Sequence, residues 1–345
     1  MKNLPSSRPA VPCRYLRSAA HIAPLAAALA FVNVTTAAES ASAPDKNLAK
    51  SEVVSLQNFV VTGSNIRRLD MEKVVPITVI DPDAMAARHA AMTQAQARLR
   101  ADLTAARLDA LIVIGDDQEE LFDHSNMPAI GLFQGASIRN AQGTPAHDAM
   151  GRARSRFLEA GGAVEYPCEA GLARHLIEYL QDHDFDIAVS GSIPPGKAEG
   201  HAYSYIHKFC MDGPPVPIVP VFLNAYYPPN QPTPRRCHAL GAALARAIAA
   251  FPGDARVGVM ASGGLSHFVV DESFDRDIIS ALEHQDAEFF RNAPLHKLRS
   301  GSSEIRNWIC LAGAVETLRL DWVSYVPGYR TPALTGTGLC FASFR

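Results

Sequence analysis

The sequence predicts an α/β protein of three layers, αβα, with a mixed central sheet and a poorly ordered N-terminal extension before it. Short continuous apolar runs such as LIVIG at 111–115 are typical of central strands buried on both faces. Stretches with helical spacing of apolar residues separate these runs, which is the alternation expected of an α/β fold. Hydrophobic residues make up 48% and charged residues 19% of the 345 residues, which indicates a globular chain of one or two domains.

The first 81 residues differ from the rest. Residues 1–38 have the pattern of a secretory signal peptide, in which four basic residues precede an apolar stretch from Ala19 to Val34. Residues 39–81 are expected to be a linker followed by EVVSLQNFVVTGSNIRRLDMEKVVPITVI at 52–80. That segment resembles the start of the plug domain of TonB-dependent outer-membrane receptors. The resemblance covers this segment alone.

From residue 82 onward, apolar spacing and composition predict alternating helices and strands. Helices are predicted over 83–108, 148–160, 172–182, 239–251 and 275–291. Strands are predicted at DALIVIGDD (109–117), FDIAVSG (185–191), PPVPIVPVFLNAYY (214–227) and ARVGVMASGG (255–264). The segment 131–145 is rich in turn residues and is predicted to be irregular.

Composition restricts the partners and the compartment. The formal net charge of −3 provides no global basic field, so a nucleic-acid partner is not expected. Six scattered cysteines, with no CxxC pair, favour buried reduced thiols over a disulfide framework. We therefore expect the catalytic domain to be cytoplasmic, although the signal-like segment would allow export.

Two segments carry residues suited to chemistry. In SGGLSH, His267 follows a strand and a glycine turn, and an imidazole placed there can act as a general base. In GSSEIRNW, Glu304 begins a predicted helix with Ser302 or Ser303 as its N-cap. Glu304 can serve the helix dipole or bind a cation from an adjacent cleft.

Other polar segments leave alternatives open. GDDQEELFDH offers Asp116 and its acidic neighbours either to a magnesium ion or to solvent. In EGHAYSYIHKF, His201 is expected in a loop and His207 in the core. Arg235 and Arg236 can meet an anionic substrate group or make surface pairs.

Taken in order, five segments resemble the class III extradiol ring-cleavage dioxygenases of the LigB superfamily. They are LIVIGDDQEELFDHSNMPAI, EGHAYSYIHKF, PVFLNAYYPPNQPTPRRCHALGAAL, ASGGLSHFVVDE and SSEIRNWI, within residues 82–345. The resemblance implies a non-haem Fe(II) centre that cleaves a catechol with dioxygen. It implies that Glu304 is an iron ligand, His267 the acid/base residue, and His201 a second catalytic histidine near the substrate. Family members commonly assemble, so a homo-oligomer is also implied.

The chain departs from the family pattern at two ligand positions. The GTSH-type motif of the first strand is missing, and its loss is expected to expose a sheet edge and part of the core. At the second ligand position, Gln118 stands where the family has a histidine, and it offers only an amide oxygen to the metal. His124 or His89 are alternative ligands, without a geometric argument for either.

Three functions therefore remain open. The leading prediction is an extradiol dioxygenase impaired by missing iron ligands, acting on a catechol that the sequence does not identify. The second is a non-catalytic homologue that binds phenolic ligands. The third is a fragment of a TonB-dependent receptor.

Overall fold

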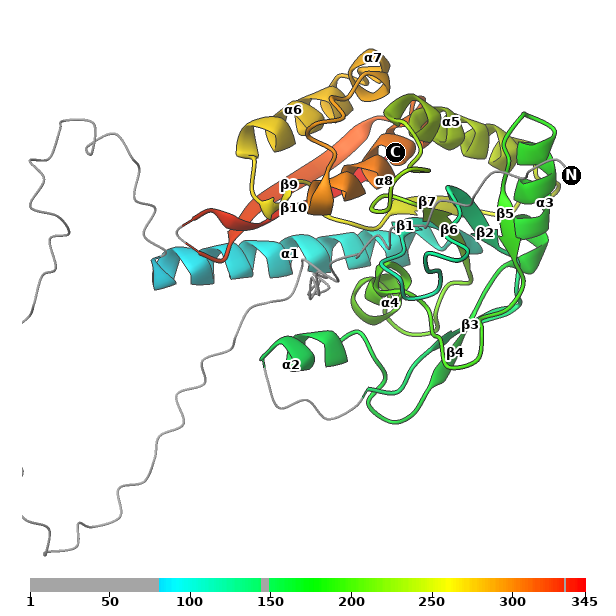
Figure 1. The fold of residues 1–345 in the computed structure, drawn as a ribbon, viewed down its shortest axis with the longest axis horizontal. Helices are drawn as coiled ribbons and strands as arrows, with labels where there is room; N and C mark the ends of the chain where they lie inside the picture. Colours follow the sequence, from blue (N-terminus) through cyan, green and yellow to red (C-terminus); the bar gives the residue numbers. More distant parts are fainter. Residues whose placement is uncertain (1–80, 144–148, 332) are drawn as a thin grey trace, which may run out of the picture.

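A computed structural model describes residues 81–143, 149–331 and 333–345 (Figure 1). The predicted signal peptide of residues 1–38, the linker and nearly all of the receptor-like segment lie outside these residues. The described helices are α1 (Pro82–Ala106), α2 (Ala149–Ser155), α3 (Ala170–Gln181), α4 (His201–Tyr205), α5 (Pro234–Ala250), α6 (Glu272–Glu283), α7 (Ala287–Arg291) and α8 (Ile305–Ala314).

Five strands form the central sheet in the order β5-β2-β6-β1-β7. They are β1 (Ala110–Asp116), β2 (Ile130–Phe133), β5 (Ala188–Ser190), β6 (Ile218–Leu223) and β7 (Val257–Ala261). β1 is parallel to both β6 and β7, β2 is parallel to β5, and β2 is antiparallel to β6. The sheet is therefore mixed, as predicted.

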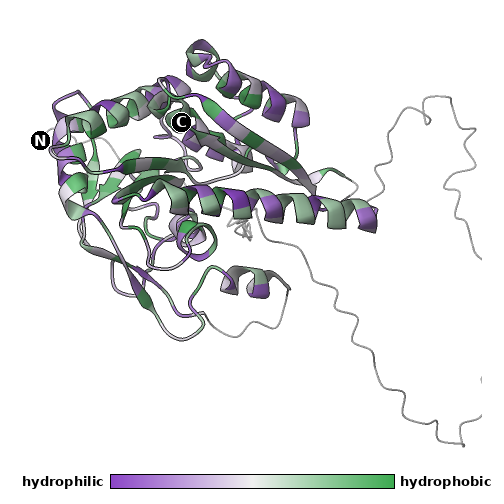
Figure 2. Ribbon diagram, turned by 180° about the vertical axis from the view of Figure 1, so that it is seen from behind, coloured by the Kyte–Doolittle hydropathy of each residue, from purple (hydrophilic) through white to green (hydrophobic). Residues whose placement is uncertain are grey.

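Helices cover both faces of this sheet, which confirms the three-layer prediction (Figure 1). Ile112 and Ile114 of β1 pack in the core formed with α3, α5 and α8, whereas Leu111 and Val113 pack in the core on the α1 and α4 side. This alternation explains the continuous apolar run, because each face of a central strand needs its own buried side chains. Figure 2 shows hydrophobic colour concentrated in these inner strands.

A second sheet extends the molecule beyond the central one. Its order is β8-β10-β9, with β8 (His267–Val269), β9 (Leu320–Tyr329) and β10 (Thr335–Phe344) all antiparallel. The long helix α1 lies against the β9–β10 hairpin, where Met92 is buried against Trp322 and Phe341. β3 (Ser137–Asn140) and β4 (Val164–Pro167) form a separate two-stranded antiparallel sheet, with α2 between them in the chain.

Two of the long helices begin directly after capping residues. Asp81 accepts a hydrogen bond from the amide of Asp83, and Pro82 occupies the first turn of α1, where no amide donor is needed. Thr233 and Pro234 start α5 in the same way. The predicted start of α5 at residue 239 was therefore five residues late, because proline is compatible with a first helical turn.

Several other predictions were wrong. The turn-rich segment 131–145 contains most of β2 and all of β3, so buried pairing prevailed there over turn-forming residues. The single helix predicted over 275–291 is two helices, α6 and α7, interrupted at Gln285, which has a left-handed backbone (φ 54°). The helix predicted over 148–160 ends at Ser155, and residues 156–160 are turns, bends and an isolated bridge.

Strand β7 forms one edge of the central sheet among the described strands. Within the described part of the chain it pairs only with β1, and all five of its residues are half-buried. No described helix has both the length and the apolar composition of a membrane span. The five cysteines in the described residues are free.

Candidate active site

The candidate site lies where β1 and β7 end. Asp116 is the last residue of β1, and the loop Ser262–Gly264 follows β7. Carboxyl ends of parallel strands are the usual place for ligands in α/β sheets, because loops diverge there. His267 at the start of β8, Glu304 at the start of α8 and His201 at the start of α4 converge on the same place.

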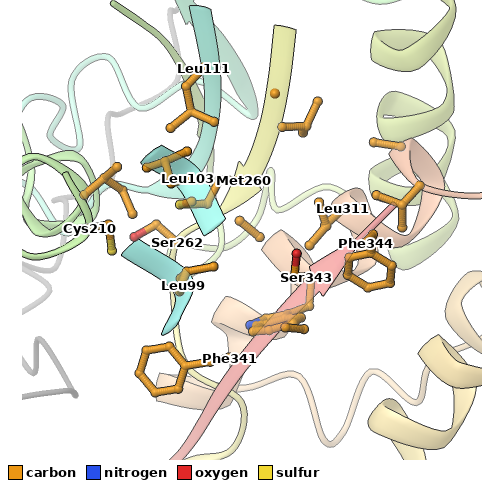
Figure 3. A pocket seen from close by; sticks show the side chains of 18 of the residues that line it. Leu99, Leu103, Leu111, Cys210, Met260, Ser262, Leu311, Phe341, Ser343 and Phe344 are labelled. Atoms are coloured by element: carbon orange, nitrogen blue, oxygen red, sulfur yellow. The ribbon is translucent and has the colours of Figure 1, made fainter. Parts of the chain in front are cut away.

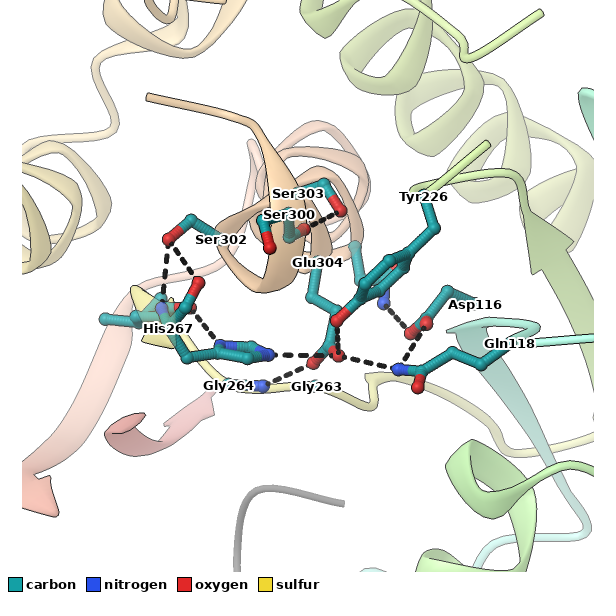
Figure 4. A network of polar contacts seen from close by, with 12 residues as sticks. Asp116, Gln118, Tyr226, Gly263, Gly264, His267, Ser300, Ser302, Ser303 and Glu304 are labelled. Atoms are coloured by element: carbon teal, nitrogen blue, oxygen red, sulfur yellow. Dashed lines mark hydrogen bonds and ion pairs between the residues drawn. The ribbon is translucent and has the colours of Figure 1, made fainter. Parts of the chain in front are cut away.

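Glu304 is the centre of a polar network, shown in Figure 4. Its Oε1 accepts hydrogen bonds from the Tyr226 hydroxyl at 3.0 Å and from Gln118 Nε2 at 3.2 Å. Its Oε2 accepts from the Gly264 amide at 3.1 Å. Although burial alone would raise its pKa, the charges of His267 and His201 and the amide bond keep the pKa of Glu304 below its usual value.

Asp116 is buried beside Glu304, but its pKa is shifted in the opposite direction. Its Oδ2 accepts from Gln118 Nε2 at 3.3 Å and its Oδ1 from Asn307 Nδ2 at 3.3 Å. Burial and the neighbouring Glu304 charge raise the pKa of Asp116 to about 7. In the metal-free site, Glu304 therefore carries the negative charge more readily than Asp116.

His201 is held by Glu120 at the first residue of α4. Both its backbone amide (3.0 Å) and its Nδ1 (2.8 Å) bond to the Glu120 carboxylate. Burial alone would lower the pKa of His201, but Glu120, Asp116 and Glu304 outweigh it and raise the pKa to about 10. Its Nδ1 bond to Glu120 leaves Nε2 available to a ligand.

His267 is fixed from three directions. Its Nδ1 lies 2.8 Å from the Leu265 carbonyl oxygen. Its backbone amide donates to Ser302 Oγ at 2.9 Å, and Ser302 Oγ donates back to the His267 carbonyl at 2.9 Å. The buried Nε2 lies 3.1 Å from Glu304 Oε1, an ion-pair contact outside hydrogen-bond geometry. That nitrogen therefore points into the site, towards Glu304.

The donor set suits a divalent metal ion. One ligand atom each from Asp116, His201 and Glu304 lies within 4.8 Å of the others. Imidazole and carboxylate donors bind first-row divalent metals, and a group of three leaves other coordination positions open. Burial and the neighbouring Glu304 charge raise the pKa of Asp116, and a bound cation would relieve the repulsion between these two carboxylates.

The structure brings the four predicted site residues together, although one of them is oriented differently from the prediction. His267, His201, Glu304 and Gln118 are all present at the site, but Gln118 directs its amide nitrogen, rather than its oxygen, at the two carboxylates. The prediction of a loop at His201 was wrong, because it starts a helix.

Neither alternative histidine belongs to the donor set. His124 is 86% exposed and lies 3.3 Å from Glu119, and His89 lies on α1. His207 is a core histidine, as predicted, with its Nδ1 2.9 Å from Glu199.

Two expectations about surrounding residues were also wrong or incomplete. Neither Ser302 nor Ser303 caps α8, because Ser302 bonds to His267 and Ser303 to the Ser300 carbonyl. Sequence reasoning placed Asp116 in an acidic run at the carboxyl end of a buried strand but did not name it as an iron ligand, and it missed Tyr226. The position of Asp116 at the end of a buried strand was the signal that distinguishes it from the solvated acids after it.

Comparison with known proteins gives a family match over most of the chain. The family described as the catalytic LigB subunit of aromatic ring-opening dioxygenase matches residues 76–339. The match begins six residues before the predicted domain boundary at 82, inside the segment that resembles a receptor plug.

Curated relatives match over shorter ranges. A gallate dioxygenase of Pseudomonas putida is 37% identical over 177 residues, covering 48% of this chain and 51% of the relative. A 2,3-dihydroxyphenylpropionate/2,3-dihydroxicinnamic acid 1,2-dioxygenase of Comamonas testosteroni is 28% identical, covering 51% of this chain and 49% of the relative. The match thus spans about half the length of these relatives. A solved structure of an uncharacterized Escherichia coli K12 protein is 14% identical, with a TM-score of 0.41, covering 72% of this chain and 92% of that one.

Proposed function

Because this chain belongs to the LigB family of aromatic ring-opening dioxygenase subunits, we propose that it cleaves a catechol ring with dioxygen in the extradiol manner. The proposed cofactor is Fe(II), held by Asp116, His201 and Glu304. The observation that carries the proposal is the convergence of these three donors with His267. The names of the relatives support an aromatic substrate and dioxygen as co-substrate.

In this proposal Asp116 replaces an imidazole ligand of the family pattern. Gln118, at the position where the resemblance implies a histidine, bonds to Asp116 and Glu304 and orients both carboxylates. When bound, Fe(II) would supply the redox chemistry and a template for the two substrates. The side chains around it supply orientation and proton transfer.

His267 is the proposed acid/base residue. Its Nδ1 is engaged by the Leu265 carbonyl, so Nε2 is the nitrogen that can exchange a proton with a phenolic hydroxyl of the substrate. The two hydrogen bonds between Ser302 and the His267 backbone help to fix the orientation of the His267 imidazole, so that little reorganisation is needed before proton transfer. Tyr226 donates to Glu304 and keeps that carboxylate facing the same space.

Anaerobic Fe(II) loading of the full chain, followed by measurement of oxygen uptake with a panel of catechols, tests this proposal. We expect one iron per chain and catechol-dependent uptake. His267→Ala should retain the iron and lose most of the uptake, because the base is not a ligand. Absence of iron, or uptake unchanged in His267→Ala, would contradict the proposal.

One observation favours a second candidate, a binding protein for phenolic ligands that works without iron. The Gln118 amide nitrogen donates to two of the three proposed ligands and so satisfies carboxylate oxygens that a metal would otherwise use. Catechol binding without stoichiometric iron would support this candidate. The receptor-fragment alternative has no support, since the family match covers residues 76–339.

A further inference from the structure

A cavity of about 550 Å³ leads away from the candidate site along β7, which is an edge strand among the described residues. His201, Glu304 and the Ser262–Gly264 loop line its polar end. Its remaining wall is mostly aliphatic and aromatic, with contributions from α1, α8, β7 and β10 (Figure 3). A volume of this size is typical of small-molecule sites.

The charge of the wall is as informative as its shape. Among the described residues, no lysine or arginine lines the cavity, and its only carboxylates are Glu304 and Asp102. Asp102 is bonded to Trp322 Nε1 at 2.7 Å, and Arg345 pairs with it at 3.5 Å. Apart from His201, which the proposed function assigns to the metal, the described lining therefore offers no cation to an anionic substrate group.

The cations that the sequence suggested for an anionic substrate are engaged elsewhere. Arg235 bonds to Asn292, and Arg236 bonds to the Asp184 carbonyl and lies over the Phe185 ring. None of these residues lines the cavity.

We propose that the substrate is an uncharged catechol whose ring carries an apolar substituent, and that this substituent occupies the β7 cavity. The inference rests on the proposed function, because it places the catechol oxygens at the end formed by His201 and Glu304. A buried carboxylate without a cation would cost free energy that an alkyl chain does not. The wall selects against the carboxylated catechols and in favour of alkyl- or aryl-substituted ones.

Titration calorimetry on the metal-free full chain under anaerobic conditions measures this preference without turnover. The ligands are 4-methylcatechol, 4-hexylcatechol and 3,4-dihydroxybenzoate. Burying methylenes should tighten binding about two- to four-fold for each one, so 4-hexylcatechol should bind about 30-fold or more tighter than 4-methylcatechol. The carboxylate should bind more weakly than either.

A matched pair of variants tests the location. Val259→Phe fills the cavity from the half-buried edge strand β7. Val189→Phe adds the same group to β5, at the opposite edge of the same sheet, where Val189 is 44% exposed. Val259→Phe should weaken 4-hexylcatechol binding about ten-fold and leave 4-methylcatechol unchanged, whereas Val189→Phe should alter neither.

Each outcome has a definite meaning. Equal or tighter binding of 3,4-dihydroxybenzoate would overturn the inference, as would an unaffected Val259→Phe. Failure of all three ligands to bind would also overturn it. If 4-hexylcatechol binds as expected but the iron-loaded chain consumes no oxygen with it, the inference stands and the proposed dioxygenase activity fails.

Discussion

Gly301 is the position where one added methyl group should disable the proposed base without removing a ligand. A Cβ at Gly301 would lie 2.3 Å from His267 Cδ2 and 2.6 Å from the His267 carbonyl oxygen. Ordinary contact begins at 3.4 Å, so Gly301→Ala requires the two segments to separate by about 1.1 Å. Whichever side moves, the relation between His267 and Glu304 changes. A misplacement of about 1 Å can reduce turnover about 100-fold, or about 2.7 kcal/mol of transition-state stabilisation.

Oxygen-uptake kinetics of the iron-loaded variant measure this effect as kcat/KM. Gly161→Ala is the matched control, since a Cβ there has no neighbour within 4 Å and should leave kcat/KM unchanged. Thermal unfolding verifies that Gly301→Ala is folded, because overpacking itself costs about 1–3 kcal/mol. A folded, iron-loaded Gly301→Ala with kcat/KM close to that of the unmodified chain would refute the argument that this contact positions His267.

Three further predictions follow from single contacts. Asp116→Asn should weaken Fe(II) binding, measured by anaerobic titration, about ten-fold or more, because an amide oxygen is a poorer ligand than a carboxylate; unchanged affinity would remove Asp116 from the ligand set. Asp271 caps α6 and pairs with Lys297, and burial, which would raise its pKa, is outweighed by these partners, so its folded-state pKa is lowered. Its contribution is therefore present above its unfolded pKa near 3.8 and lost as pH falls through the lower folded value. Asp271→Asn keeps a capping oxygen but loses the charge that pairs with Lys297, so it should destabilise by about 0.5 kcal/mol at pH 7 in denaturant unfolding, and a difference that did not shrink in acid would contradict the pairing. Gly241→Ala should destabilise by about 3 kcal/mol or more, since its Cβ would lie 1.8 Å from the Cys310 carbonyl oxygen where α5 crosses α8; a Tm equal to that of Gly161→Ala would disprove that close packing.

The sequence was sufficient to predict the layers and four of the five strands of the central sheet. The apolar runs that became β1 and β6 are long enough to identify strands buried on both faces. The small strands β2 and β8 were not predicted, because four residues or fewer give too short a pattern to outweigh turn-forming neighbours. Their pairing depends on partners distant in the chain.

The sequence predicted which residues form the site better than it predicted the role of each residue. His267 and Glu304 were identified by the segments around them, and the structure places both at the site. The ligand position assigned to Gln118 illustrates the limit of that reasoning. Asp116 presents an oxygen to the site, whereas Gln118 presents a nitrogen. This difference depends on where β1 ends and on the side-chain orientations after it, and the spacing of residues in the sequence predicts neither.

The wide separation of the site residues along the chain has a consequence for folding. The Gln118–Glu304 hydrogen bond joins positions 186 residues apart, and the proposed ligands Asp116, His201 and Glu304 come from three separate segments. An unfolded chain does not hold such a set together, so a bound ion stabilises the native state alone. At an ion concentration 100 times its Kd, this amounts to about 2.7 kcal/mol. Metal supply would then regulate how long the chain survives proteolysis as well as whether it reacts.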